Sequence, residues 1–223
     1  MNYTTAQLRD WGMNQFETIS KYTSEFHRRL LEIIVIDTFS QFHCFHSGSN
    51  SAHFADFVLK YGGDYSNLLS AVCPSVLYYN EFDKDPNTKL KLQQSRIIKA
   101  DEAIAVQEAN RLLGLLSEDR KKKAEKRYSY AALIYQMRNK LVHQATCVNM
   151  PIDFHDSNDI TPYMACENEI KDGKLVFKGW TLNIPEEYIV AVGKECINNY
   201  IVACDQGSAI VDSSNPGLQY KWY

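Results

Sequence analysis

Residues 128–143 read YSYAALIYQMRNKLVH, and this stretch decides which fold the sequence predicts. Its apolar residues recur at three- and four-residue spacing, the pattern of an amphipathic helix that buries one face. Polar residues follow at its end, among them Arg138 and His143. We therefore predict a long helix that begins near Ser117, runs to Gln144 and carries an arginine and a histidine in its C-terminal part.

Arg138 and His143 form a pair that suits phosphate chemistry. An arginine stays charged and binds two phosphate oxygens at once, while a histidine exchanges a proton near neutral pH, and neither role needs a metal or a cofactor. Five residues at about 100° each put the two side chains about 140° apart on an ideal helix. A frayed last turn or a second subunit would bring them together.

A simpler role for both residues stays open. Cations in the last turn of a helix offset the partial negative charge of its free carbonyl groups. Arg138 and His143 would then only stabilise the end of their helix.

The run from Tyr135 to His143 resembles the RNase motif of the HEPN superfamily (higher eukaryotes and prokaryotes nucleotide-binding). In that motif an Arg, a polar residue that is commonly Asn, a few spacers and a His end a long helix of an all-α domain. The resemblance spans roughly residues 24–146. Its upstream part consists of residues in a similar order: Ile33, Ile34, Asp37, Phe39, Phe54, Phe57, Val58, Tyr61, Val72, Pro74 and Leu77.

The resemblance implies a metal-independent endoribonuclease, of the kind that serves as a toxin or antiphage component. His143 would act on the proton of a ribose 2′-hydroxyl or of the leaving oxygen, and Arg138 would stabilise charge on the phosphate oxygens. Asn139 would orient His143; the alternative is an exposed Asn at a helix end.

The resemblance also implies partners and a second hypothesis. Family RNases assemble the site from two protomers, so a homodimer is expected. RNA is the expected substrate, and an antitoxin or another protein is a possible partner. Some relatives are non-catalytic modules that bind RNA, a nucleotide or a protein. Those relatives typically lack the Arg or the His, and this sequence has both at positions 138 and 143.

Asp37 is a single charge in the apolar stretch from Ile33 to Phe39. An unpaired charge in such a stripe is costly. Asp37 could therefore lie beside Arg138 and fix its guanidinium, or it could face solvent on the opposite side of its helix.

A basic run directly precedes the Arg/His helix segment, in a chain whose net charge is only -3. It could guide a phosphate backbone toward the Arg/His pair, with Tyr128 or Tyr130 stacking on a base. The alternative is an ordinary solvated helix face. The run consists of Arg120, Lys121, Lys122, Lys123, Lys126 and Arg127.

Four residues look at first like metal ligands, since His43 and His46 share a helix spacing with Cys44 between them and His53 nearby. No second pair at ligand spacing accompanies them, so we predict no structural zinc. The six cysteines lack close pairs, which favours reduced thiols.

Composition bounds the class of protein. The 223 residues are 45% hydrophobic and 12% aromatic, enough to fill a core. The polar start from Met1 to Asp10 is unlike a secretion signal, and no apolar run is long enough to cross a bilayer. We expect no membrane association and a cytoplasmic location.

We predict a mainly α fold: a HEPN-like helical bundle over residues 1–150, with an extension over residues 151–223 packed on it. In the extension, Asp172 and Gly173 separate two β-prone runs, which indicates a β-hairpin. Pro185, followed by two glutamates, indicates a terminal helix to about Cys204.

Overall fold

The computed structural model describes residues 4–43, 50–92, 97–144, 160–171 and 174–210. The chain forms two compact units, each built from separate stretches of sequence. The helical unit takes in residues 1–69, 131–148 and 189–223, and the sheet-bearing unit takes in residues 70–130 and 149–188. A domain boundary at residue 150 stays a prediction.

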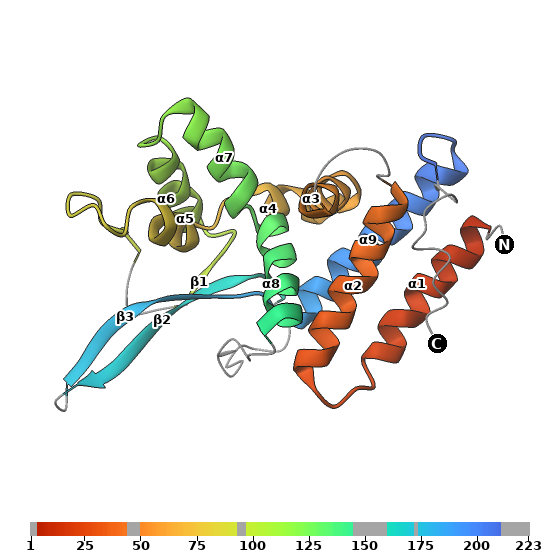
Figure 1. Ribbon diagram of the computed structural model, residues 1–223, viewed down its shortest axis with the longest axis horizontal. Helices are drawn as coiled ribbons and strands as arrows, with labels where there is room; N and C mark the ends of the chain where they lie inside the picture. The colour runs from red at the N-terminus through yellow and green to blue at the C-terminus, as the bar shows by residue number, and fades with distance from the viewer. Residues whose placement is uncertain (1–3, 44–49, 93–96, 145–159, 172–173, 211–223) are drawn as a thin grey trace. The chain divides into compact units, whose positions relative to one another are not determined.

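The protein is mainly helical, as predicted, with one small antiparallel sheet (Figure 1). The helical unit contains α1 (Thr5–Ile19), α2 (Glu25–His43), α3 (Asn50–Tyr61), η1 (Gly63–Tyr65) and most of α4 (Ser66–Ser70), α8 (Tyr130–Gln144) and α9 (Glu186–Asp205). The sheet-bearing unit contains α5 (Pro74–Glu81), β1 (Ile98–Lys99), α6 (Ala103–Leu113), α7 (Glu118–Tyr128), β2 (Tyr163–Lys171) and β3 (Lys174–Asn183).

The first helix begins at a capping box. Thr4 accepts a hydrogen bond from the Gln7 backbone at 3.2 Å, and the Gln7 side chain accepts one from the Thr4 backbone at 3.0 Å. Two donors that a helix N-terminus leaves free are thereby satisfied. In the core of the helical unit, α1 and α9 approach closely, because a Cβ added at Gly193 would lie 2.5 Å from the ring of Phe16.

The predicted hairpin is confirmed. β2 and β3 pair antiparallel from Tyr163 opposite Asn183 to Lys171 opposite Lys174. The Asp-Gly turn itself, residues 172–173, lies outside the described residues. No sequence pattern predicted β1, a strand of two residues that pairs with the start of β2.

The single long helix predicted from Ser117 is wrong, because the chain breaks at Ser129 into α7 and α8. Ser129 is extended, with φ -64° and ψ 151°, and pairs with Val72 in an isolated β-bridge. The Cys73 amide donates to the Tyr128 carbonyl, and the Tyr130 amide donates to the Ala71 carbonyl, both at 3.0 Å. The backbone groups at the break, which make no helical hydrogen bond, thus bond to residues 71–73, far away in sequence.

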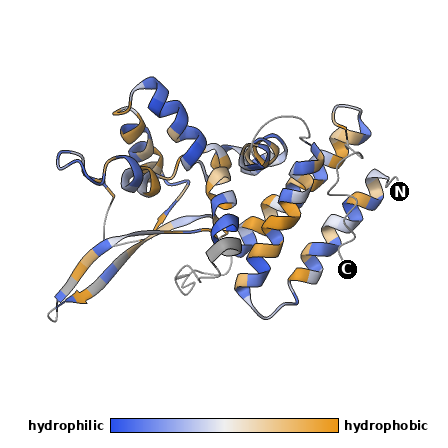
Figure 2. Cartoon of the chain, viewed as in Figure 1, coloured by the Kyte–Doolittle hydropathy of each residue, from blue (hydrophilic) through white to orange (hydrophobic). Residues whose placement is uncertain are grey.

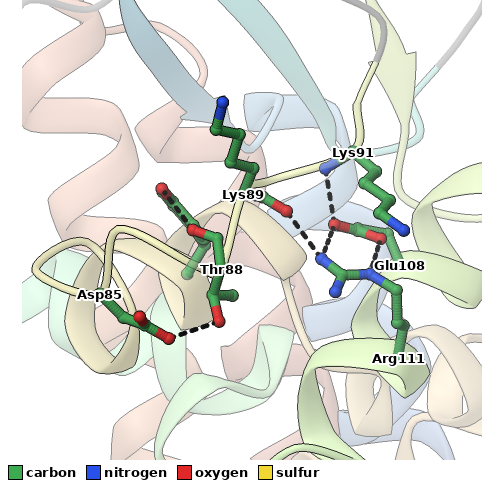
Figure 3. Close-up of polar contacts among 7 residues, drawn as sticks. Asp85, Thr88, Lys89, Lys91, Glu108 and Arg111 are labelled. Carbon is green, nitrogen blue, oxygen red and sulfur yellow. Dashed lines mark hydrogen bonds and ion pairs between the residues drawn. The ribbon is translucent and has the colours of Figure 1, made fainter.

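A buried carboxylate holds the loop after α5 against α6 in the sheet-bearing unit (Figure 3). Glu108 accepts two hydrogen bonds from Arg111 and one from the Lys91 backbone amide, each 2.7 Å long. Arg111 also donates to the Lys89 carbonyl at 2.8 Å. Glu108 is 4% exposed, and this set of charged hydrogen bonds compensates for its burial.

Candidate functional site

The candidate site centres on an ion pair within the helical unit. Arg138, on α8, places Nη2 3.7 Å from Oδ2 of Asp37, on α2. The side chains are 26% and 12% exposed, respectively. Of the two positions that the sequence left open for Asp37, the structure therefore has the one beside Arg138.

Asp37 lies in a largely desolvated position. Its Oδ1 accepts hydrogen bonds from the Ser40 hydroxyl at 3.3 Å and from the Gln41 amide at 3.4 Å. Burial raises the pKa of Asp37, and this effect outweighs the lowering by Arg138, by the two hydrogen bonds and by the charge of His53. Arg138, the hydrogen bonds from Ser40 and Gln41 and the charge of His53 therefore favour the ionised carboxylate, while burial disfavours it.

Arg138 has further neighbours on its own helix. Its Nη1 donates to Oδ1 of Asn139 at 3.1 Å, and its guanidinium lies 5.8 Å from the ring centroid of Tyr135. Its Nε is buried and has no hydrogen-bond partner among the residues that the structure describes. Asp37, Asn139 and Tyr135 thus surround the guanidinium on several sides.

Sequence reasoning missed two residues of this site, Tyr135 and His53. The Tyr135 ring lies 5.4 Å from that of Phe54, which anchors α3 against α8. Burial raises the pKa of Tyr135, Asp37 raises it further, and Arg138 lowers it. A residue one turn before a helical arginine shares its face, so the three-residue spacing could have indicated Tyr135.

The sequence pattern indicates His53 only as a candidate metal ligand. The structure instead puts it within electrostatic reach of Asp37, whereas His43 belongs to an aromatic cluster with Tyr61 and Tyr200. Cys44 and His46 lie outside the described residues. Within the described ranges, no group of three or more His, Cys, Asp or Glu side chains could hold a metal ion.

His143 lies in the last turn of α8, and its side chain is outside the part of the chain that the structure describes. The unbroken helix from Arg138 onward keeps the five-residue spacing of the sequence. On an ideal helix that spacing separates two positions by about 140°.

The basic run forms most of α7, in the sheet-bearing unit, whereas Arg138 belongs to the helical unit. Tyr128 and Tyr130 are 3% and 1% exposed, respectively. The expectation that one of them stacks on a base is therefore wrong, because both rings are packed inside the protein.

Comparisons with known proteins give no relative: no family model, no curated protein and no solved structure matches the chain. Among the helices in the described ranges, none combines the length and the apolar character needed to span a bilayer.

Chemically, the site offers a cation next to a buried anion. A guanidinium held in this way can bind an oxyanion, since Arg138 stays 26% exposed while Asp37 and Asn139 lie beside it. The carboxylate can hold the guanidinium in place without itself touching a ligand.

Proposed function

We propose that the protein is a metal-independent endoribonuclease of the HEPN type, acting in the cytoplasm. The observation that carries the proposal is the ion pair between Arg138 and Asp37, because it orients a half-buried guanidinium on the helix that also bears His143. The resemblance of the run from Tyr135 to His143 to the HEPN motif supplies the reaction class.

In this reaction a ribose 2′-oxygen attacks the adjacent phosphorus while the bond to the 5′-oxygen breaks. The 2′-hydroxyl loses its proton to a base, and the leaving 5′-oxygen gains one from an acid. His143 performs one of these transfers, since an imidazole exchanges protons near neutral pH. Arg138 stabilises the charge that develops on the phosphate oxygens. The products carry 2′,3′-cyclic phosphate and 5′-hydroxyl ends.

Asp37 and Asn139 act as positioning residues. Asp37 restrains the guanidinium from α2, and Asn139 accepts a hydrogen bond from Arg138 at 3.1 Å. A group fixed before the reaction avoids the cost of ordering it in the transition state.

A homodimer completes the site in this proposal. Arg138 and His143 of one helix diverge, so the Arg138 of one copy and the His143 of a second copy would meet at one phosphate. Such an enzyme would serve as a toxin or antiphage component, held in check by an antitoxin or another partner protein.

The competing function is a non-catalytic dimeric module that binds RNA, a nucleotide or a partner protein. The ion pair itself favours this alternative in one respect, because a guanidinium neutralised by Asp37 can serve helix packing alone.

Incubation of the pure protein with mixed RNA in EDTA separates the two functions. The enzyme is expected to cut RNA equally well in EDTA and in Mg²⁺, with products that a phosphatase specific for cyclic ends converts to 3′-hydroxyls. Intact RNA under every condition, or 5′-phosphate products, would favour the binding module.

A further inference from the structure

Helix α7 presents a cationic face on the sheet-bearing unit. Ala124 and Tyr128 are buried in the core of that unit, with Leu112 and Leu116. Lys122, Lys123, Lys126 and Arg127 are exposed. At 100° per residue, these four residues cover one side of the helix, which the exposed Asp119 shares in the first turn, and the buried pair covers the other. The helix is almost entirely hydrophilic in Figure 2.

The two arginines of this helix are already engaged within the protein. Nη2 of Arg120 lies 2.6 Å from Oε2 of Glu81, on α5. The Arg127 guanidinium lies 5.7 Å from the ring centroid of Tyr128.

The lysines are not engaged. Lys121, Lys122, Lys123 and Lys126 have no ion pair or side-chain hydrogen bond with any residue that the structure describes. Lys121 is half-buried, so the three fully exposed lysines form the accessible part of the face. Their charges repel each other, and an external anion would relieve this repulsion.

Glu81 fixes the position of α7. Besides Arg120, its carboxylate accepts a 2.8 Å hydrogen bond from the Tyr128 hydroxyl. The Tyr128 carbonyl in turn accepts from the Cys73 amide. The helix is therefore tied to α5 at both ends, and the lysines project from a rigid support.

We propose that α7 binds the phosphate backbone of single-stranded nucleic acid through Lys122, Lys123 and Lys126, and that Glu81 withholds Arg120 from this surface. The proposal goes beyond the proposed function, since this surface lies on a different unit from Arg138 and binds whether or not the protein cleaves RNA.

Two features select a phosphate backbone as the ligand. Lysine ammonium groups act as point charges toward phosphates, without the planar fork that reads a base edge or fits a carboxylate. The neighbouring Tyr128 and Tyr130 are buried and unable to stack on bases. Binding therefore depends on backbone charge alone, and RNA and DNA should bind alike.

The test measures binding of the Arg138→Ala protein, so that cleavage cannot change the probe. Fluorescence anisotropy with labelled oligo-uridine RNA and oligo-thymidine DNA of equal length, over a series of NaCl concentrations, gives the salt slope. Three phosphate contacts predict a slope of about -2 in log affinity against log salt.

Lys122→Gln, Lys123→Gln and Lys126→Gln in one variant should flatten this slope by about 2. The matched control changes three exposed lysines of the same unit, Lys84, Lys174 and Lys178, to Gln and alters net charge equally. The control should keep the slope. Equal slopes for the two triple variants would overturn the proposal.

Glu81→Gln is a second variant, which should bind nucleic acid more tightly than the protein with Glu81. It releases Arg120, adds one phosphate contact and should steepen the slope by about 0.7. Adding Arg120→Gln should reverse that gain, and an unchanged slope in Glu81→Gln would refute the withholding role. Binding of RNA without DNA, or equal competition by polyglutamate, would refute a phosphate-backbone ligand.

Discussion

Asp37 on α2 and Arg138 on α8 form an ion pair, with 3.7 Å between Oδ2 and Nη2. The pair joins two helices of one unit and orients the guanidinium that we assign to phosphate binding. Because the Asp37 side chain is 12% exposed, Arg138 offsets part of the cost of burying its charge, together with the hydrogen bonds from Ser40 and Gln41. Function and stability are therefore linked at this contact.

We expect Asp37→Asn to change how stability depends on pH. Burial, the largest effect, raises the pKa of Asp37, with Arg138 and its hydrogen bonds opposing it. The native chain then binds this proton more tightly than the unfolded chain. The Asp37 contribution to the unfolding free energy therefore falls as pH rises through the raised pKa. Urea unfolding of wild type and variant from acidic to neutral pH measures the difference.

Asp85→Asn is the control, because the pKa of Asp85 is shifted in the opposite direction to that of Asp37. Hydrogen bonds from the Thr88 hydroxyl and the Asn87 backbone lower the pKa of Asp85. Its stabilising contribution is complete above the ordinary aspartate pKa and is lost as pH falls through the lowered value. If Asp37→Asn left the pH profile of wild type unchanged, burial of Asp37 would not be coupled to its ionisation.

Arg111→Ala should destabilise the sheet-bearing unit strongly. It removes the two hydrogen bonds that Arg111 donates to Glu108 in Figure 3. The Glu108 side chain, which is 4% exposed, then keeps only the Lys91 backbone amide as a donor among the described residues. We expect a loss on the order of 3 kcal/mol in the free energy of unfolding. Arg120→Ala breaks the more exposed pair with Glu81 and should cost below about 1 kcal/mol. If both variants lost the same free energy of unfolding in chemical denaturation, Glu108 would not be what holds the loop after α5 against α6.

Gly193→Ala should destabilise the helical unit by about 1–3 kcal/mol, because overpacking forces neighbours to move. The added Cβ would lie 2.5 Å from Phe16 and 3.0 Å from Ile36. Gly114→Ala, whose Cβ would have no contact closer than 3.4 Å, should stay within about 0.5 kcal/mol of wild type. A thermal melt in which both variants match wild type would argue against close packing of α9 on α1.

We expect a homodimer whose interface includes the end of α8, measured by light scattering. Mixing the inactive Arg138→Ala and His143→Ala proteins should then restore about a quarter of wild-type cleavage, because half of the dimers are mixed and each has one intact site. A strictly monomeric protein, or no rescue after subunit exchange, would contradict a site shared between copies.

Local signals predicted much of the fold. The hairpin of β2 and β3 and the helix start after Pro185 depend on residues a few positions apart, and both are present. The break at Ser129 depends on Val72, far away in sequence, so periodicity alone could not reveal it. At the site, the cost of a lone charge made a contact with Arg138 one of the two positions expected for Asp37. The proximity of His53 to Asp37 results from the packing of α3. The spacing of residues along the sequence does not predict such packing.

RNA cleavage by single-residue variants shows whether Arg138 and His143 carry out the reaction. Wild type, Arg138→Ala and His143→Ala are compared in EDTA, with Arg9→Ala and His27→Ala as matched controls on the surface of the helical unit. We predict that Arg138→Ala and His143→Ala each lose about a hundredfold or more in rate with unchanged circular dichroism, and that Arg138→Lys restores little. The controls should cleave like wild type. Cleavage that persists in both Arg138→Ala and His143→Ala would rule out a ribonuclease site formed by these two residues.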